Sequence, residues 1–161
     1  IIQSNRFKCL NQTIYSRCQL IHFNNLSQDE LYGWAEDILQ NKNDKSVIPS
    51  YMTPKKVSQL IKDDLFEDLK KLNSHLSTLF NKGIDGKVIS DVIDLNIDFN
   101  EKLNYIIDFA LLISKEGTSN IHPVRLSDFI QELINFRENL FEINSLNQRY
   151  SLHHLLLKIP C

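Results

Sequence analysis

The sequence has few of the glycines and prolines that usually mark turns, and few of the cysteines that usually cross-link a small protein. Four glycines and four prolines in 161 residues leave few turn signals, which favours long helices joined by short loops. The three cysteines, at positions 9, 18 and 161, form no close C-x-x-C pair, so the chain has the pattern of neither a disulfide framework nor a zinc site. We expect these thiols to be reduced.

Long apolar runs are also missing. No stretch approaches the roughly 20 residues that a membrane helix needs, and the first residues lack the basic flank and cleavage site of a secretory signal. We therefore expect a cytoplasmic protein that makes no membrane contact. The chain begins at Ile1 rather than at methionine, so we expect a fragment that lacks its N-terminal part.

Common catalytic and binding motifs are absent too. The formal net charge of −2 gives no general reason to expect nucleic-acid binding. The turn Gly83–Lys87 lacks the spacing, the Ser or Thr, and the preceding strand of a phosphate loop. His153 and His154 are adjacent and therefore point in different directions on a helix, which argues against a metal site. We expect no metal, and we expect that the chain itself does not hydrolyse ATP.

What is present near the N-terminus has the pattern of strand ends. Ile1-Ile2 leads into the polar group Gln3, Ser4 and Asn5, and the polar turn Thr13–Gln19 leads into the short apolar run Leu20–Phe23. A short, bounded apolar run of this kind is typical of a buried strand. An arginine just before it, Arg17, would be held by the sheet while its guanidinium reaches outwards, where it could bind phosphate oxygens.

From Ser27 onwards the pattern is helical. Ser27 with Glu30 is a capping-box signature, and Thr53-Pro54 marks a second helix start. From Thr53 the apolar positions predict one helix to about Asn81, with a leucine seam that we expect to pack within a bundle rather than form a coiled-coil dimer. We predict stops at Gly83 and near Gly117, a helix capped by Ser127, and a last helix from about Gln148 to Leu157. The seam consists of Leu65, Leu69, Leu72, Leu76 and Leu79.

The stretch Thr-Ile-Tyr-Ser-Arg-Cys-Gln, residues 13–19, resembles the Ser-Arg-Cys motif of the clamp-loader subunits of DNA replication, and most of all the bacterial ones. In that family the arginine is a finger that reaches the ATP bound by a neighbouring subunit. The resemblance implies this catalytic role for Arg17, with Ser16 and Cys18 as its motif neighbours. It also implies that Gln3, Ser4 or Asn5 lies at the sensor-1 position, although the residues do not decide which.

The C-terminal segment 143–158 is similar to the ending of δ′-type subunits of the same family, where an Asn-rich turn and an arginine precede a leucine-rich helix. That helix belongs to the collar, through which five subunits associate. The resemblance implies a collar interface. The apolar run Leu155–Leu157 favours burial on two sides, by the chain's own domain and by a neighbour, and a core helix covered within the chain is the alternative. The expected interface residues are Asn147, Arg149, Leu152, Leu155 and Leu156.

The resemblance implies a mainly α fold in three parts. Residues 1–23 would be the C-terminal edge of an AAA+ α/β module with one or two short strands, residues 24–64 a small helical lid, and residues 65–161 an all-α helical-bundle collar. Two features depart from the family: the chain between Gln40 and Leu65 is too short for a three-helix lid, and no Gly-rich segment carries a sensor-2 arginine.

The implied function is that of a subunit of DNA polymerase III holoenzyme that helps to load the sliding clamp on primed DNA. Its partners would be the other clamp-loader subunits, in a hetero-oligomeric ring of five, with the sliding clamp and primed DNA contacted through the complex. The fragment itself would hold no cofactor, because ATP and Mg²⁺ would be bound by a neighbouring subunit.

Two alternatives remain open, and a third lacks the feature that it requires. The chain could be a γ/τ-type ATPase subunit, which carries the same Ser-Arg-Cys motif together with an upstream phosphate loop. It could be an unrelated helical adaptor that binds a partner through the seam Leu65–Leu79. A helical DNA-binding module would need a basic recognition helix, and we find none.

Overall fold

The computed structural model describes residues 17, 26–36, 47–49, 51–63, 65–117, 121–140 and 145–159. These residues form seven α-helices and no β-strand. The prediction of a mainly α protein is therefore confirmed. The expected strand segments Ile1–Asn5 and Leu20–Phe23 lie outside the described residues.

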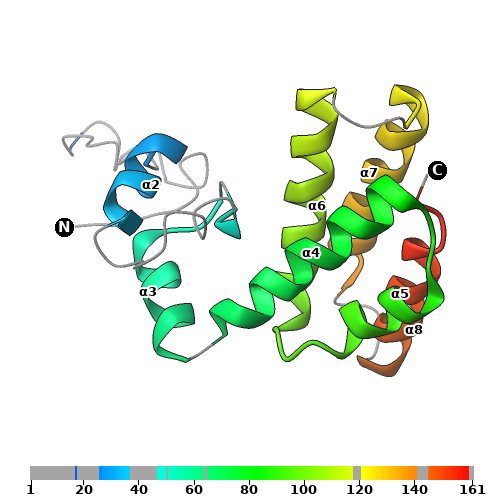
Figure 1. The fold of residues 1–161 in the computed structure, drawn as a ribbon, viewed down its shortest axis with the longest axis horizontal. Coiled ribbons are helices and arrows are strands. Elements are labelled where there is room, and N and C mark those ends of the chain that lie inside the picture. Colours follow the sequence, from blue (N-terminus) through cyan, green and yellow to red (C-terminus); the bar gives the residue numbers. More distant parts are fainter. Residues whose placement is uncertain are drawn as a thin grey trace.

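The helices lie in two groups (Figure 1). Helices α2 (Gln28–Glu36) and α3 (Pro54–Lys62), with residues 47–49 and 51–53, make up what we call the N-terminal lobe. The other five helices make up the helical bundle, in which α6 pairs with α7 and α5 packs against both α4 and α8. They are α4 (Phe66–Lys82), α5 (Gly86–Asp94), α6 (Phe99–Glu116), α7 (Pro123–Glu138) and α8 (Ser145–Leu156).

Local side-chain caps set the starts of both lobe helices. The Ser27 backbone N–H donates to Glu30 Oε2 at 2.8 Å, and the Glu30 backbone N–H donates back to Ser27 Oγ at 3.3 Å. The hydrogen bonds from Ser27 lower the pKa of the Glu30 carboxyl. At α3, Thr53 Oγ1 accepts from the backbone N–H of Lys56, and Pro54 occupies the first turn, where no N–H is needed. Both predicted starts are confirmed.

The leucine seam lies inside the bundle. The last four leucines of the seam, Leu69, Leu72, Leu76 and Leu79, are at most 1% exposed. A helix with one apolar stripe must bury it, and here the other helices of the same chain cover it. This burial confirms the prediction of bundle packing and removes the seam as a surface for a coiled-coil partner or an adaptor function.

The prediction of one helix from Thr53 to Asn81 is wrong, because the chain turns after Lys62. The Asp63 backbone N–H closes α3 by donating to the Gln59 carbonyl oxygen, and the Leu65 N–H donates to the Leu60 carbonyl oxygen at 3.0 Å. The first is an ordinary i→i−4 bond at the C-cap, whereas the second spans five residues, satisfies one of the last carbonyls of the helix and ends it. The structure therefore has two helices, α3 and α4, that point in different directions (Figure 1).

Side-chain caps set the starts of α5 and α6, and a glycine sets the end of α6. Asp85 accepts from the Lys87 backbone N–H at 2.9 Å, and Asp98 accepts from the backbone N–H groups of Asn100 and Glu101. Gly117 ends α6 with φ +62°, a left-handed conformation that a residue with a Cβ adopts at a cost. The predicted end of α6 near Gly117 is confirmed.

Helix α7 begins earlier than predicted. We expected Ser127 to cap it, but the helix starts at Pro123 after an extended His122, and Ser127 lies within it. Proline suits a first helical position because its φ is already helical and its missing N–H has no partner to lose. Further along, Phe129 of α7 packs edge-on against Phe80 of α4, with ring centroids 6.1 Å apart.

None of the helices in the described part of the chain combines the length and apolar character that crossing a membrane requires.

Candidate functional site

The residue that the sequence singled out most strongly, Arg17, lies in a turn and is exposed. A guanidinium presents five donors in a planar fork that matches two phosphate oxygens, and it remains charged at any physiological pH. The other residues of this predicted site, Ser16 and Cys18 with the group Gln3, Ser4 and Asn5, lie outside the described residues.

The leucines predicted for the collar interface are buried against their own chain, and their burial by a neighbour stays a prediction. Leu152 and Leu156 are completely buried in the core of the chain itself, and Leu155 is 8% exposed. The physical reason is their spacing: positions 152, 155 and 156 share one face of α8, and that face packs on the bundle, where α5 is its neighbour. Leu152 and Leu156 are therefore covered by the chain itself, whereas Leu155 lines a surface groove on α8.

The polar members of the expected interface do lie at the surface. Asn147 and Arg149 are both exposed on the first turns of α8. Arg149 Nη2 donates to Asp94 Oδ1, so the guanidinium forms an ion pair with the last residue of α5. Exposed ion pairs of this kind contribute little stability but fix the position of a side chain.

The outer face of α8 and the turn that follows it carry a stripe of exposed side chains that was not predicted as a site. Tyr150 is 70% exposed and Leu157 is 40% exposed, and His154 lies between them at helical spacing. A shallow groove of about 410 Å³ runs beside this stripe, lined by Phe136 of α7 and by α8 residues. Exposed aromatic side chains beside a groove are the usual anchors of protein–protein interfaces. The α8 residues in the groove are Tyr150, Ser151, His154 and Leu155.

Helix α6 contains the one buried charged side chain among the described residues. Lys102 is 3% exposed, and its Nζ donates to the Ile93 and Leu95 carbonyl oxygens at 2.6 and 3.1 Å. These are the last carbonyls of α5, where a cation is favoured by the helix dipole. Burial, and then the positive charge of Arg149, lower the pKa of Lys102 to about 8, while Asp94 and Asp68 oppose the shift.

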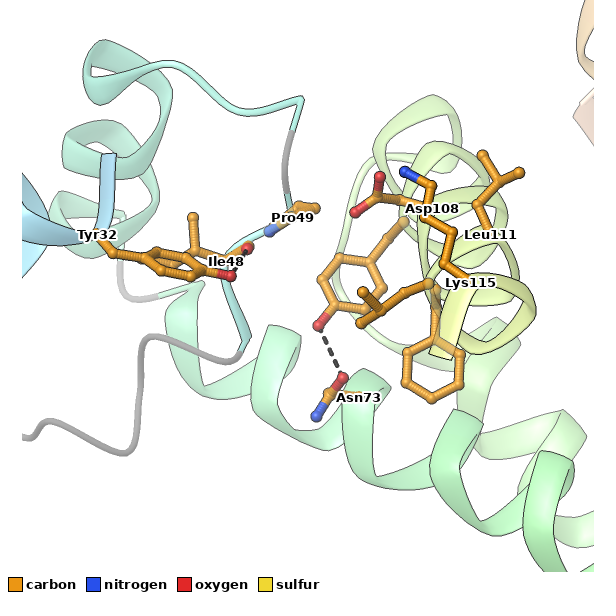
Figure 2. A pocket seen from close by; sticks show the side chains of 10 residues that line it. Tyr32, Ile48, Pro49, Asn73, Asp108, Leu111 and Lys115 are labelled. Carbon is orange, nitrogen blue, oxygen red and sulfur yellow. Dashed lines mark hydrogen bonds between the residues drawn. The ribbon is translucent and has the colours of Figure 1, made fainter. Parts of the chain in front are cut away.

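A pocket of about 220 Å³ separates the N-terminal lobe from α6. Figure 2 shows Tyr32, Ile48 and Pro49 on the lobe side, with Asp108, Leu111 and Lys115 opposite them on α6. The buried Tyr105 hydroxyl, at the edge of this pocket, donates to the Val47 carbonyl oxygen at 3.0 Å and to Asn73 Oδ1 at 3.1 Å. Burial raises the pKa of the Tyr105 phenol, and Asp108 adds to the effect.

Neither the buried Lys102 nor the buried Tyr105 was predicted as a candidate site residue. Their sequence signal is weak: Lys102 and Tyr105 stand three residues apart, next to the buried Leu103 and Ile106. A lysine on the apolar face of a helix indicates that its ammonium has partners elsewhere in the fold.

No group of three or more His, Cys, Asp or Glu residues that could hold a metal ion occurs among the described residues. Comparison with protein-family models, with curated proteins and with solved structures found no match for this chain.

Proposed function

We propose that this chain is part of a δ′-type subunit of a bacterial clamp loader, the complex that uses ATP to place the sliding clamp on primed DNA. The observation that carries the proposal is the Thr13–Gln19 motif, which has an exposed Arg17 and precedes a chain that is helical in its described part. Both the motif and the helical bundle are what a clamp-loader subunit requires. Such a protein acts in the cytoplasm.

The role of Arg17 in this proposal is chemical and acts on another subunit. Its guanidinium would contact the γ-phosphate of ATP-Mg²⁺ held by the neighbour and stabilise the charge that develops during phosphoryl transfer. An arginine finger is worth roughly 10³ to 10⁵ in rate where it has been measured. The exposure of Arg17 supports the proposal because a finger must be able to leave the surface of its own chain.

The helical bundle would hold the ring of five subunits together. With Leu152 and Leu156 covered by the chain itself, the surface that supports this role is the outer face of α8 and the turn after it, where Tyr150 and Leu157 are exposed. A large exposed tyrosine is well suited to such a contact, since aromatic side chains dominate binding energy at interfaces.

The proposal is tested by changing Arg17 in a reconstituted clamp loader. We expect Arg17→Ala to leave assembly intact and to abolish the part of the clamp- and DNA-stimulated ATP hydrolysis that comes from the neighbouring site. Arg17→Lys should restore little of it, because an ammonium cannot form the planar two-point contact.

The matched control is Arg125→Ala, which removes an exposed arginine from α7. A complex that contains this variant should hydrolyse ATP at the unaltered rate. If Arg17→Ala and Arg125→Ala behave alike in a complex that has assembled, the assignment of the finger is wrong.

A further inference from the structure

Three exposed side chains follow one line along α8 and the turn after it. Tyr150, His154 and Leu157 stand at positions i, i+4 and i+7, which share one face of a helix. The Leu157 backbone N–H donates to the His153 carbonyl oxygen, so helical bonding continues as far as Leu157. These three residues, which we call the α8 stripe, have the spacing of a seam between two paired helices.

Ion pairs border the α8 stripe on both sides. Arg149 pairs with Asp94 on the α5 side, and Lys158 Nζ lies 2.9 Å from Glu132 Oε2 on the α7 side. The segment 145–159 contains no acidic residue, so both carboxylates come from the flanking helices. An apolar centre with a polar rim is the usual anatomy of a protein–protein interface.

The balance of charge at this surface decides which kind of partner fits it best. A nucleic acid or a strongly acidic protein is attracted by an excess of cations, whereas Arg149 and Lys158 already have carboxylates beside them. The best complement is a surface with the same apolar centre and the same balanced rim. A second copy of the chain supplies that surface, because both subunits of a two-fold dimer use the same patch.

We propose that the chain on its own forms a two-fold dimer through the α8 stripe, with the two α8 helices antiparallel. Tyr150 of each copy then packs beside the partner's Leu157, and both copies of His154 lie near the two-fold axis. The partner's Leu157 enters the groove of about 410 Å³ between Tyr150 and Phe136. Each cation of the rim keeps its own carboxylate, so dimerisation leaves no charge without a partner.

The size of the α8 stripe indicates a weak dimer. Two tyrosines and two leucines together bury less than the roughly 1,200 Å² of a stable complex. Helix α8 lies on the side of the bundle away from the N-terminal lobe, so a second copy can approach it without meeting α2 or α3 (Figure 1). The inference concerns the chain alone and does not depend on the proposed function. The proposed ring would use the same face, so a second copy and a neighbouring subunit exclude each other.

Sedimentation equilibrium of the full chain, at concentrations up to about 1 mM, tests the proposal. We expect a reversible dimer that Tyr150→Asp and Leu157→Asp each weaken at least tenfold, because a carboxylate would then be buried in the apolar centre. The control is Val124→Asp, which changes a 60% exposed apolar residue of α7 outside the stripe and should keep the dimer. Circular dichroism checks that all three variants are folded. A chain that stays monomeric would overturn the proposal, as would a dimer that Tyr150→Asp weakens no more than Val124→Asp.

The antiparallel arrangement is tested by cross-linking. The native cysteines at positions 9, 18 and 161 are changed to serine, and His154→Cys is introduced as the reactive site. Mild oxidation should link two copies through position 154, because this position lies near the two-fold axis. Ser127→Cys, at an exposed position on α7, should link far less. Equal linking of the two variants, or no linking through position 154, would contradict the arrangement. Because no other clamp-loader subunit is present, either failure leaves the proposed function untouched.

Discussion

The Tyr105 hydroxyl donates a hydrogen bond to the Val47 carbonyl oxygen across 58 positions of the sequence, at 3.0 Å. This bond joins α6 of the helical bundle to the N-terminal lobe, and the same hydroxyl also reaches Asn73 of α4. This one hydroxyl therefore links three segments that lie far apart in the sequence: α6, α4 and the N-terminal lobe.

Tyr105→Phe should lower the free energy of unfolding by about 1 to 2 kcal/mol, because a buried carbonyl and a partly buried amide lose their partner. Urea denaturation measures the difference. Tyr150→Phe is the control: Tyr150 is 70% exposed, so its loss of a hydroxyl should change the stability by less than about 0.5 kcal/mol. Equal effects of the two changes would contradict a structural role for the Tyr105 hydroxyl.

The buried ammonium of Lys102 should make stability rise with pH in the alkaline range. Its pKa is about 8 in the folded chain and near the ordinary value of 10.5 in the unfolded chain. Between these values the unfolded state binds more protons, so the free energy of unfolding increases with pH, by at most about 3 kcal/mol over the whole interval. Below about pH 8 both states are protonated and this contribution is absent.

Lys102→Met should abolish that rise, whereas Lys71→Met, at an exposed position, should keep it. Unfolding curves between pH 7 and 9.5 measure the slope. The range ends there because burial also raises the pKa values of Tyr51 and Tyr105 in the folded chain. Ionisation of these tyrosines in the unfolded chain above about pH 10 lowers stability and would mask the lysine. The same slope in both variants would show that Lys102 is not its source.

Leu76 lies in the middle of the buried seam and has no exposed surface. Leu76→Ala should therefore lower the free energy of unfolding by about 2 to 5 kcal/mol, whereas Leu157→Ala, at a 40% exposed position, should cost far less. Urea denaturation together with sedimentation velocity measures both variants. A variant that dissociates an oligomer while its own stability stays unchanged would mean that the seam is an interface between chains.

Features that depend on neighbours in sequence were the ones that could be predicted. The starts of α2 and α3 follow from Ser27 with Glu30 and from Thr53-Pro54, because a cap involves only residues within one turn. The end of α6 follows from Gly117 for the same reason. Pro123 carries an equally local signal for the start of α7, whereas the prediction placed the cap at Ser127.

The break between α3 and α4 could not be predicted in this way. The turn contains no glycine or proline, and backbone bonds such as that from Leu65 to Leu60 end the helix. The apolar spacing continues across the break, so periodicity alone indicated one long helix.

The candidate site residues differ in the same way: a residue in a local motif could be predicted, whereas residues whose partners lie far along the chain could not. Arg17 was found through its neighbours in the motif, whereas Lys102 and Tyr105 acquire their partners only when α5 and the lobe are in place. The run Leu155–Leu157 suggested apolar surface on all sides of α8. In the structure, Leu155 and Leu156 share a buried face with Leu152, and Leu157 alone points away from it.

The central claim, that this chain is a clamp-loader subunit, is tested most directly by native mass spectrometry of the chain mixed with the other subunits of a bacterial clamp loader. The account predicts a complex of five subunits that contains one copy of this chain, and weaker incorporation when Tyr150 is changed to Asp. A chain that stays alone while the other subunits associate with one another would contradict the account.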